Sequence, residues 1–101
     1  MEHRLDNRVE IPIYVAIHTE HLDTYKTRIS NISTGGAQVQ IDSNWDIRKK
    51  NVVLIEFMEE LLSVKIPALV MWTSAISASL MFIEHVSDLR SYLRYHNQIS
   101  V

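Results

Sequence analysis

Residues 25–41 read YKTRISNISTGGAQVQI, which is two alternating runs of side chains joined by a turn. Successive side chains of a strand point to opposite faces, so Tyr25, Thr27 and Ile29 are predicted to face inward. The alternation breaks between Ile29 and Ile32, and we therefore predict that Asn31 lies at a strand end or in a β-bulge. The glycine pair that follows permits a tight turn into the next strand. The stretch predicts a β-hairpin with one irregular position.

Further short strands are predicted on both sides of this hairpin. Alternation that begins at Val9 predicts a first strand before it, and later apolar runs predict strands over residues 52–58, 62–72 and 77–84. Short strands separated by turns predict a mainly β protein built as a small antiparallel barrel. Helical spacing near the end predicts a final helix, which Ser87 can cap and whose apolar stripe packs on the core.

Three side chains outside the hairpin carry specific expectations. In the strand predicted over residues 62–72, Trp72 falls in the same alternate set as the residues that face inward. It is therefore predicted to lie in the core. Trp45 lies in a predicted loop, and the pattern assigns it neither to the core nor to the surface. Glu59, together with Glu60, is predicted to lie in a solvated turn.

Composition restricts the classes of function. The chain has 101 residues, of which 47% are hydrophobic, and this suits one core and one domain. Its net charge of −2 argues against sequence-independent binding of nucleic acid, so an anionic ligand needs a local basic patch. There is no cysteine for a disulfide or thiolate metal site, which is compatible with a cytoplasmic location. The longest apolar stretch, residues 66–72, is too short to span a membrane.

Catalytic and metal-binding motifs are not recognisable in the sequence. It contains no G-x-S-x-G, P-loop or H-E-x-x-H pattern. His18 and His21 are three residues apart, a spacing that does not place both on one face of a strand. We therefore expect no enzymatic activity, no cofactor and no metal site.

Two short motifs are candidates for a binding site. Arg4 and Arg8 form an R-x-x-x-R pattern, and Asn31, Ser33 and Gly36 form an N-x-S-x-x-G pattern. Arginine donates bidentately to phosphate oxygens or to guanine O6 and N7, and its plane stacks on bases. On an extended chain Arg4 and Arg8 point the same way about 13 Å apart, which suits a clamp around a dinucleotide. Asn31 and Ser33 can hydrogen-bond base edges or phosphate, while Gly36 permits close backbone approach or a positive φ.

Together and in this order, the two motifs resemble the PilZ family, whose members bind the bacterial second messenger cyclic di-GMP. The later segments ALVMW at 68–72 and SLMF at 79–82 resemble the late strands of that family. The resemblance implies a six-stranded antiparallel barrel with a C-terminal helix. It also implies that Arg4 and Arg8 hold the phosphates and stack on guanine, that Asn31 and Ser33 meet the base, and that Gly36 completes the site.

The resemblance also implies a division of the chain and reveals two departures. A single domain over residues 1–101 would comprise a flexible arginine-bearing arm at 1–7, a barrel at 8–84 and a helix at 86–99. Family members often carry a further arginine where this chain has His3, and commonly a glycine where it has Ser79. The first departure would weaken binding or reduce the number of bound ligands. The second would narrow the room beside the site.

The function implied is that of a cytoplasmic signalling protein that binds cyclic di-GMP and relays the signal to an unidentified effector protein. Ordering of the arm is the expected switch, because binding that orders a segment changes the exposed surface. The alternative is a nucleotide-independent PilZ-fold adaptor in pilus or motility assembly. A small-barrel RNA binder is disfavoured by the acidic balance of the chain. We therefore expect neither nucleic-acid partners nor membrane insertion.

Overall fold

The computed structural model describes residues 13–59, 62, 64–84 and 87–99, with side chains described up to residue 94. Within these residues six strands are followed by one helix. Their bounds are β1 Ile13–His18, β2 Thr24–Ile32, β3 Gly36–Gln40, β4 Val52–Phe57, β5 Lys65–Thr73, β6 Ser77–Phe82 and α1 Ser87–Ile99.

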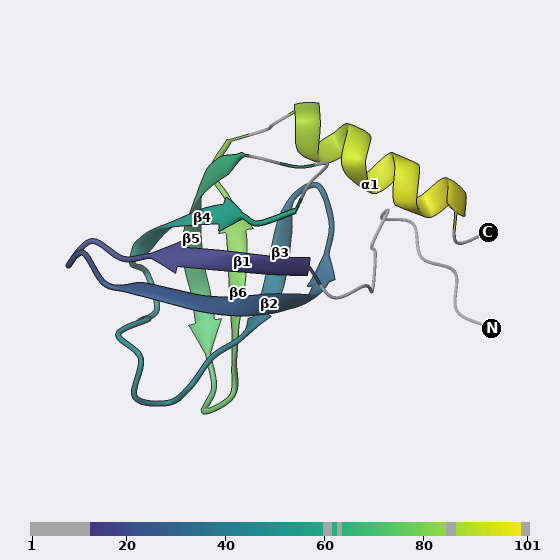
Figure 1. The fold of residues 1–101 in the computed structure, drawn as a ribbon. Coiled ribbons are helices and arrows are strands. Elements are labelled where there is room, and N and C mark those ends of the chain that lie inside the picture. The colour runs from purple at the N-terminus through teal and green to yellow at the C-terminus, as the bar shows by residue number, and fades with distance from the viewer. Residues whose placement is uncertain (1–12, 60–61, 63, 85–86, 100–101) are drawn as a thin grey trace.

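The six strands form a closed barrel in the order β1-β2-β3-β6-β5-β4 (Figure 1). Every neighbouring pair is antiparallel, and β1 closes the barrel by pairing with both β2 and β4. Closure satisfies the backbone groups that an open sheet would leave at its edges. The prediction of a mainly β, six-stranded antiparallel barrel followed by a C-terminal helix is confirmed.

Alternate side chains of each strand fill the barrel. In β4, Val53, Ile55 and Phe57 are buried, whereas Leu54 and Glu56 between them are partly exposed. The side chains that are buried in the described residues are all hydrophobic, and branched ones fit a half-buried strand well. A barrel of six strands is too narrow to hold more than its own side chains. A binding site must therefore lie on the outer face.

Helix α1 lies at one end of the barrel (Figure 1). Leu89, Tyr92 and Leu93 recur at helical spacing and are buried in the same hydrophobic cluster as the strand residues. Asp88 lies in the first turn, where its negative charge is favoured by the helix dipole. The predicted packing of the apolar stripe against the core is confirmed.

The Glu59 carboxylate connects three segments. Glu59 lies in a turn after β4, as predicted, where its carbonyl accepts the Leu62 N–H at 3.2 Å, but its side chain is only partly exposed to solvent. Its Oε2 accepts a hydrogen bond from the Tyr14 backbone N–H at 3.4 Å, and its Oε1 accepts one from the Tyr92 hydroxyl at 3.3 Å. The connection after β4 therefore contacts both the start of β1 and helix α1. Glu60 lies outside the described residues.

The observed strand bounds differ from the predicted ones by a few residues. Strand β5 begins at Lys65 because Leu62 forms only an isolated bridge with Glu59. Strand β6 ends at Phe82, two residues earlier than predicted. The predicted first strand begins at Val9, which lies outside the described residues.

Tyr92 should make the stability of the protein depend on alkaline pH. Burial raises the pKa of Tyr92 to about 12, and the charge and hydrogen bond of Glu59 contribute to the shift. The unfolded tyrosine titrates near 10, so between these values the unfolded chain has already lost a proton that the folded chain keeps. The free energy of unfolding should therefore fall as the pH rises from about 10 to about 12.

The variant Tyr92→Phe tests this, because it keeps a buried ring and removes the ionisable group. Its free energy of unfolding should fall less steeply with pH than that of the wild type over the same window. Urea unfolding of both proteins in a pH series measures the two slopes. Equal slopes would contradict the expectation.

Candidate functional site

Asn31 faces the outside of the barrel because the pairing of β2 with β3 shifts by one residue. Ile29 pairs with Val39, but Asn31 pairs with Gln38, so Ser30 is the extra residue of a β-bulge. Without the shift Asn31 would share the inward direction of Ile29. The predicted irregularity at Asn31 is confirmed, and it is a bulge within β2, not the end of the strand.

The loop between β2 and β3 is held by three hydrogen bonds. The Ser33 N–H donates to the Gly36 carbonyl at 2.9 Å, and Ser33 Oγ accepts the Gly35 N–H at 3.3 Å. Serine favours such local turns because its hydroxyl reaches the backbone two residues on. The Phe82 N–H at the end of β6 donates to the Gly35 carbonyl at 2.9 Å. Ser33 Oγ thus holds the turn by accepting the hydrogen bond from the Gly35 N–H. The hydroxyl proton of Ser33 can still be donated to a ligand.

Gly36 allows β3 and β6 to approach closely. A Cβ at this position would collide with the carbonyl oxygen of Leu80, and Gly36 pairs directly with Met81. Neither glycine of the loop has a positive φ. Of the two reasons predicted for a glycine here, the structure therefore supports close approach and not a left-handed backbone.

Asn31, Ser33 and Gly36 line one hollow on the outer face of the barrel, with a volume of about 210 Å³. Its other lining residues come from β3 and β6 and are Ala37, Gln38, Ser79 and Leu80. The family resemblance places Ser79 beside the site, and its position in the hollow agrees with that. Ala37, Gln38 and Leu80 were not predicted, because they belong to the hollow through strand pairing and carry no motif of their own. All the lining side chains are uncharged. The hollow can hydrogen-bond the edge of a polar molecule, but it cannot neutralise an anion by itself.

The two motif arginines, Arg4 and Arg8, lie outside the described residues. Two other basic residues, Lys26 and Arg28, are exposed on β2. Arg28 Nε donates to the side-chain oxygen of Gln40 at 3.3 Å. Neither Lys26 nor Arg28 lines the hollow, so the positive charge that an anionic ligand needs there must come from elsewhere.

The sequence profile of the PilZ domain matches residues 2–97. This chain belongs to the PilZ domain family. No curated protein matches it.

Solved structures share the fold at low sequence identity. The inhibitor of motility MotI/DgrA of Bacillus subtilis has a TM-score of 0.73 at 21% identity, over 99% of this chain and 53% of that one. The PilZ domain of YcgR from Escherichia coli has a TM-score of 0.73 at 14% identity, over 92% of this chain and 87% of that one. The PilZ domain of CeSA from a cellulose-synthesizing bacterium has a TM-score of 0.70 at 16% identity, over 93% and 98% of the two chains. This chain spans about half the length of the Bacillus protein.

Trp72 lies on the outer face of this PilZ domain, which corrects the prediction that it belongs to the core. A second register shift, between Val70 and Trp72, makes Met71 the extra residue of a bulge in β5. Trp72 then pairs with Ser79 and is 44% exposed, whereas Val70 is fully buried. Counting alternate residues along one strand does not reveal such a shift, because a bulge is defined by the pairing with the neighbouring strand.

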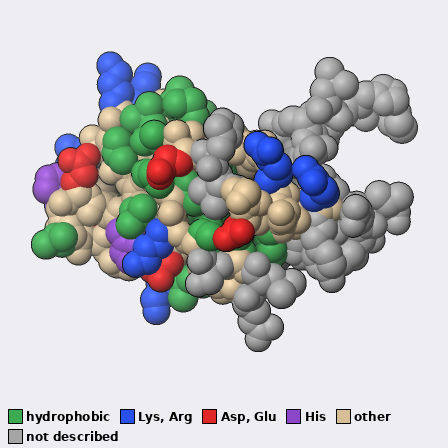
Figure 2. All heavy atoms as spheres, turned by 90° about the horizontal axis from the view of Figure 1, so that it is seen from above, with side chains coloured by type: hydrophobic (Ala, Val, Ile, Leu, Met, Phe, Trp, Pro, Cys, Tyr) green, Lys and Arg blue, Asp and Glu red, His purple; other side chains and the backbone are tan. Residues whose placement is uncertain are grey.

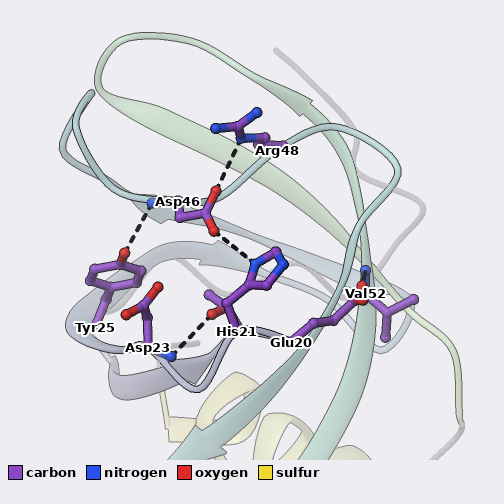
Figure 3. Close-up of polar contacts among 8 residues, drawn as sticks. Glu20, His21, Asp23, Tyr25, Asp46, Arg48 and Val52 are labelled. Atoms are coloured by element: carbon purple, nitrogen blue, oxygen red, sulfur yellow. Dashed lines mark hydrogen bonds and ion pairs between the residues drawn. The ribbon is translucent and has the colours of Figure 1, made fainter.

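A second cluster of polar contacts surrounds Asp46, in the connection between β3 and β4 (Figure 3). Its two carboxylate oxygens lie 3.0 Å from His21 Nδ1 and 3.0 Å from Arg48 Nε. The Asp46 N–H donates to the Tyr25 hydroxyl at 3.0 Å, and the Tyr25 ring stacks on Trp45 at a centroid distance of 4.7 Å. These contacts hold the connection against β2 and the β1–β2 turn. Among the described residues, no group of three His, Cys, Asp or Glu side chains could hold a metal ion.

The surface carries charges of both signs. On the face shown in Figure 2, basic and acidic side chains are interspersed with hydrophobic and neutral ones. Proteins that bind nucleic acid without sequence preference instead gather their basic residues in a stripe or patch. In the part of the chain that the structure describes, no helix is long and apolar enough to cross a membrane.

Replacing Gly36 with Ala should lower the free energy of unfolding by about 1–3 kcal/mol, the range for overpacking. The reason is the collision of the new Cβ with the Leu80 carbonyl oxygen, which is backbone and cannot swing away. The matched control is Gly35→Ala, because a Cβ at Gly35 meets no atom within 4 Å. Urea unfolding of both variants measures the difference, and equal stabilities would show that the close approach is not a constraint.

Proposed function

We propose that this PilZ domain is a receptor for cyclic di-GMP. The observation that carries the proposal is the hollow that collects Asn31, Ser33 and Gly36, the three positions of the second motif. Arg4 and Arg8 of the first motif lie within the residues that the family profile matches. Two structural neighbours support the choice of ligand, because the PilZ domain of YcgR and the protein MrkH of K. pneumonia were each solved with cyclic di-GMP.

The proposed site divides the ligand's chemistry between the barrel and the arm. Asn31 and Ser33 read the edge of a guanine, and Gly36 leaves the hollow open beside them. Arg4 and Arg8 supply the positive charge that the neutral hollow lacks and pair with the phosphates. A hydrogen bond to a charged group contributes about 1.5–3 kcal/mol, against about 0.5–1.5 kcal/mol for a neutral one. Most of the affinity should therefore come from the arginines, and selectivity for guanine from the barrel.

The proposed output is a contact with an effector protein in the cytoplasm. Phosphates that pair with Arg4 and Arg8 would hold residues 1–7 across the hollow and change the surface that the domain offers. The Bacillus neighbour is named an inhibitor of motility, so a component of the motility apparatus is the first class of effector to test.

A nucleotide-independent adaptor is the second candidate, and Ser79 is the observation that favours it. Ser79 lines the hollow at a position where members of the family commonly have glycine. Its hydroxymethyl group takes room that a ligand would otherwise use. An adaptor of this kind would bind its partner equally well with and without cyclic di-GMP.

Calorimetric titration of the isolated chain distinguishes the two candidates. Cyclic di-GMP should bind, and GMP and GTP should bind much more weakly, because only the cyclic dinucleotide presents two phosphates and two guanines to both motifs. Amide chemical shifts of residues 31–36 should move during the same titration. The absence of both heat and shift changes at near-millimolar cyclic di-GMP would favour the adaptor.

Replacing Arg8 with Ala should cost about 1.5–3 kcal/mol of binding free energy, or roughly 10- to 100-fold in affinity. Ser33→Ala should cost less, about 0.5–1.5 kcal/mol, because it removes a neutral hydrogen bond. The control Arg90→Ala removes an exposed arginine of α1 and should leave the affinity unchanged. An unaltered affinity in a folded Arg8→Ala protein would remove Arg8 from the site.

A further inference from the structure

A second and larger hollow lies over β1 and β2, which run side by side in Figure 1. Its volume is about 530 Å³, against about 210 Å³ for the hollow at the second motif, and the two share no lining residue. Ligand sites usually have volumes of about 300–1,000 Å³. We call this hollow the β1–β2 groove, and its lining includes Tyr14, Lys26, Arg28, Gln40 and Met58.

Two residues of the β1–β2 groove are cations without an acidic partner. Lys26 and Arg28 are both exposed on β2. Because they are two residues apart, they lie on the same side of the strand, roughly 7 Å from each other. Among the described residues neither forms an ion pair with a carboxylate, and Arg28 Nε donates to the neutral side chain of Gln40 at 3.3 Å. The two cations are therefore available to anionic groups of another molecule.

Two carboxylates close to the groove are held by other groups. Glu56 lies in the same cross-strand row as Lys26, since both pair with Ala16 of β1. Its Oε1, however, lies 2.9 Å from His18 Nε2. Glu59 is held by the hydrogen bonds that connect it to β1 and to α1. Neither carboxylate can turn toward the cations of the groove without losing these contacts.

The other side of the groove is apolar and exposed to solvent. Tyr14 is 57% exposed and Met58 is 49% exposed. Tyr14 pairs directly with Arg28, and the Met58 N–H donates to the Tyr14 carbonyl at 2.9 Å, so the three residues follow one another across the strands. Arginine, tyrosine and methionine are enriched in protein–protein interfaces. Because β1 is already paired with β2 and β4, a peptide at this place is bound by side chains and is not added to β1 as a further strand.

We propose that the β1–β2 groove binds an acidic segment of a partner protein. In an extended segment, carboxylates two residues apart have the same spacing of roughly 7 Å as Lys26 and Arg28, and an apolar side chain of the segment packs on Tyr14 and Met58. An inorganic anion would pair with the cations but would leave the two apolar side chains uncovered. The inference goes beyond the proposed receptor function and does not depend on it, because the groove contains no residue of either motif.

Selection of random short peptides displayed on phage tests this chemistry with the full chain as bait. The wild type should retain peptides enriched in paired acidic residues and in an apolar residue beside them. The double variant Lys26→Gln/Arg28→Gln should bind the selected peptides roughly 2- to 30-fold more weakly, the loss expected for two ion pairs at an exposed surface. The control Lys49→Gln/Arg90→Gln removes the same charge from two exposed residues outside the groove and should bind like the wild type. Urea unfolding establishes that each variant is folded.

Salt separates the contributions of the two sides of the groove. The affinity of the wild type for a selected peptide should fall as the salt concentration rises, because exposed charges are screened. Met58→Ala should weaken the binding and keep this salt dependence, because it removes only an apolar contact.

Two results of the peptide experiment would overturn the inference, namely selected peptides without acidic enrichment and equal peptide binding by the wild type and Lys26→Gln/Arg28→Gln. A double variant that loses affinity for cyclic di-GMP and keeps its peptides would also overturn it, since the two cations would then serve the nucleotide. A wild type that binds the acidic peptides but gives no heat with cyclic di-GMP would overturn the proposed function and support this inference.

Discussion

The outer face of the barrel depends on two register shifts, one on each side of the unshifted β3–β6 pair. In β2 the shift lets Ile29 and Ile32 both remain buried while Asn31 between them faces outward. In β5 the shift leaves Val70 in the core and places Trp72 outside. Without the first shift an amide would be buried in a hydrophobic interior, at a cost of about 1–3 kcal/mol if it found no partner. The shift in β2 thus keeps an amide out of the core and brings Asn31 to the hollow.

The proposed receptor separates the recognition of bases from the neutralisation of charge. The hollow is lined by uncharged side chains that are fixed by strand pairing and by the close contact of Gly36 with Leu80. Such a surface is ready for a base before the ligand arrives, and little conformational entropy is lost there on binding. In the proposal, the phosphates pair with Arg4 and Arg8, which precede the described barrel strands in the sequence. A ligand that needs both motifs would bring two separate parts of the chain together. In the proposal, this rearrangement changes the surface that an effector contacts.

Glu59 links the entry to the barrel with the final helix. One oxygen of its carboxylate accepts the Tyr14 N–H near the start of β1, and the other accepts the Tyr92 hydroxyl of α1. Tyr14 follows the arginine motif by only a few residues. A change in the path of the chain at the start of β1 would therefore disturb a carboxylate that also accepts a hydrogen bond from the Tyr92 hydroxyl of the helix. The pattern of alternation gave no indication of this contact, because it joins residues 33 and 45 positions apart.

The sequence by itself determined the strands, the final helix and the irregularity at Asn31, because alternation and helical spacing are properties of neighbouring residues along one chain. It also identified Arg4, Arg8, Asn31, Ser33 and Gly36 as candidates through motif spacing, and the ligand-binding roles of all five remain predictions. Only the tertiary structure decided that Gly36 serves close approach, that Glu59 is tied to the helix, and that Trp72 faces outward. Each of these depends on which residue of another strand or of the helix lies opposite. A one-residue shift in that pairing reverses the direction of a side chain without changing a single letter of its own strand.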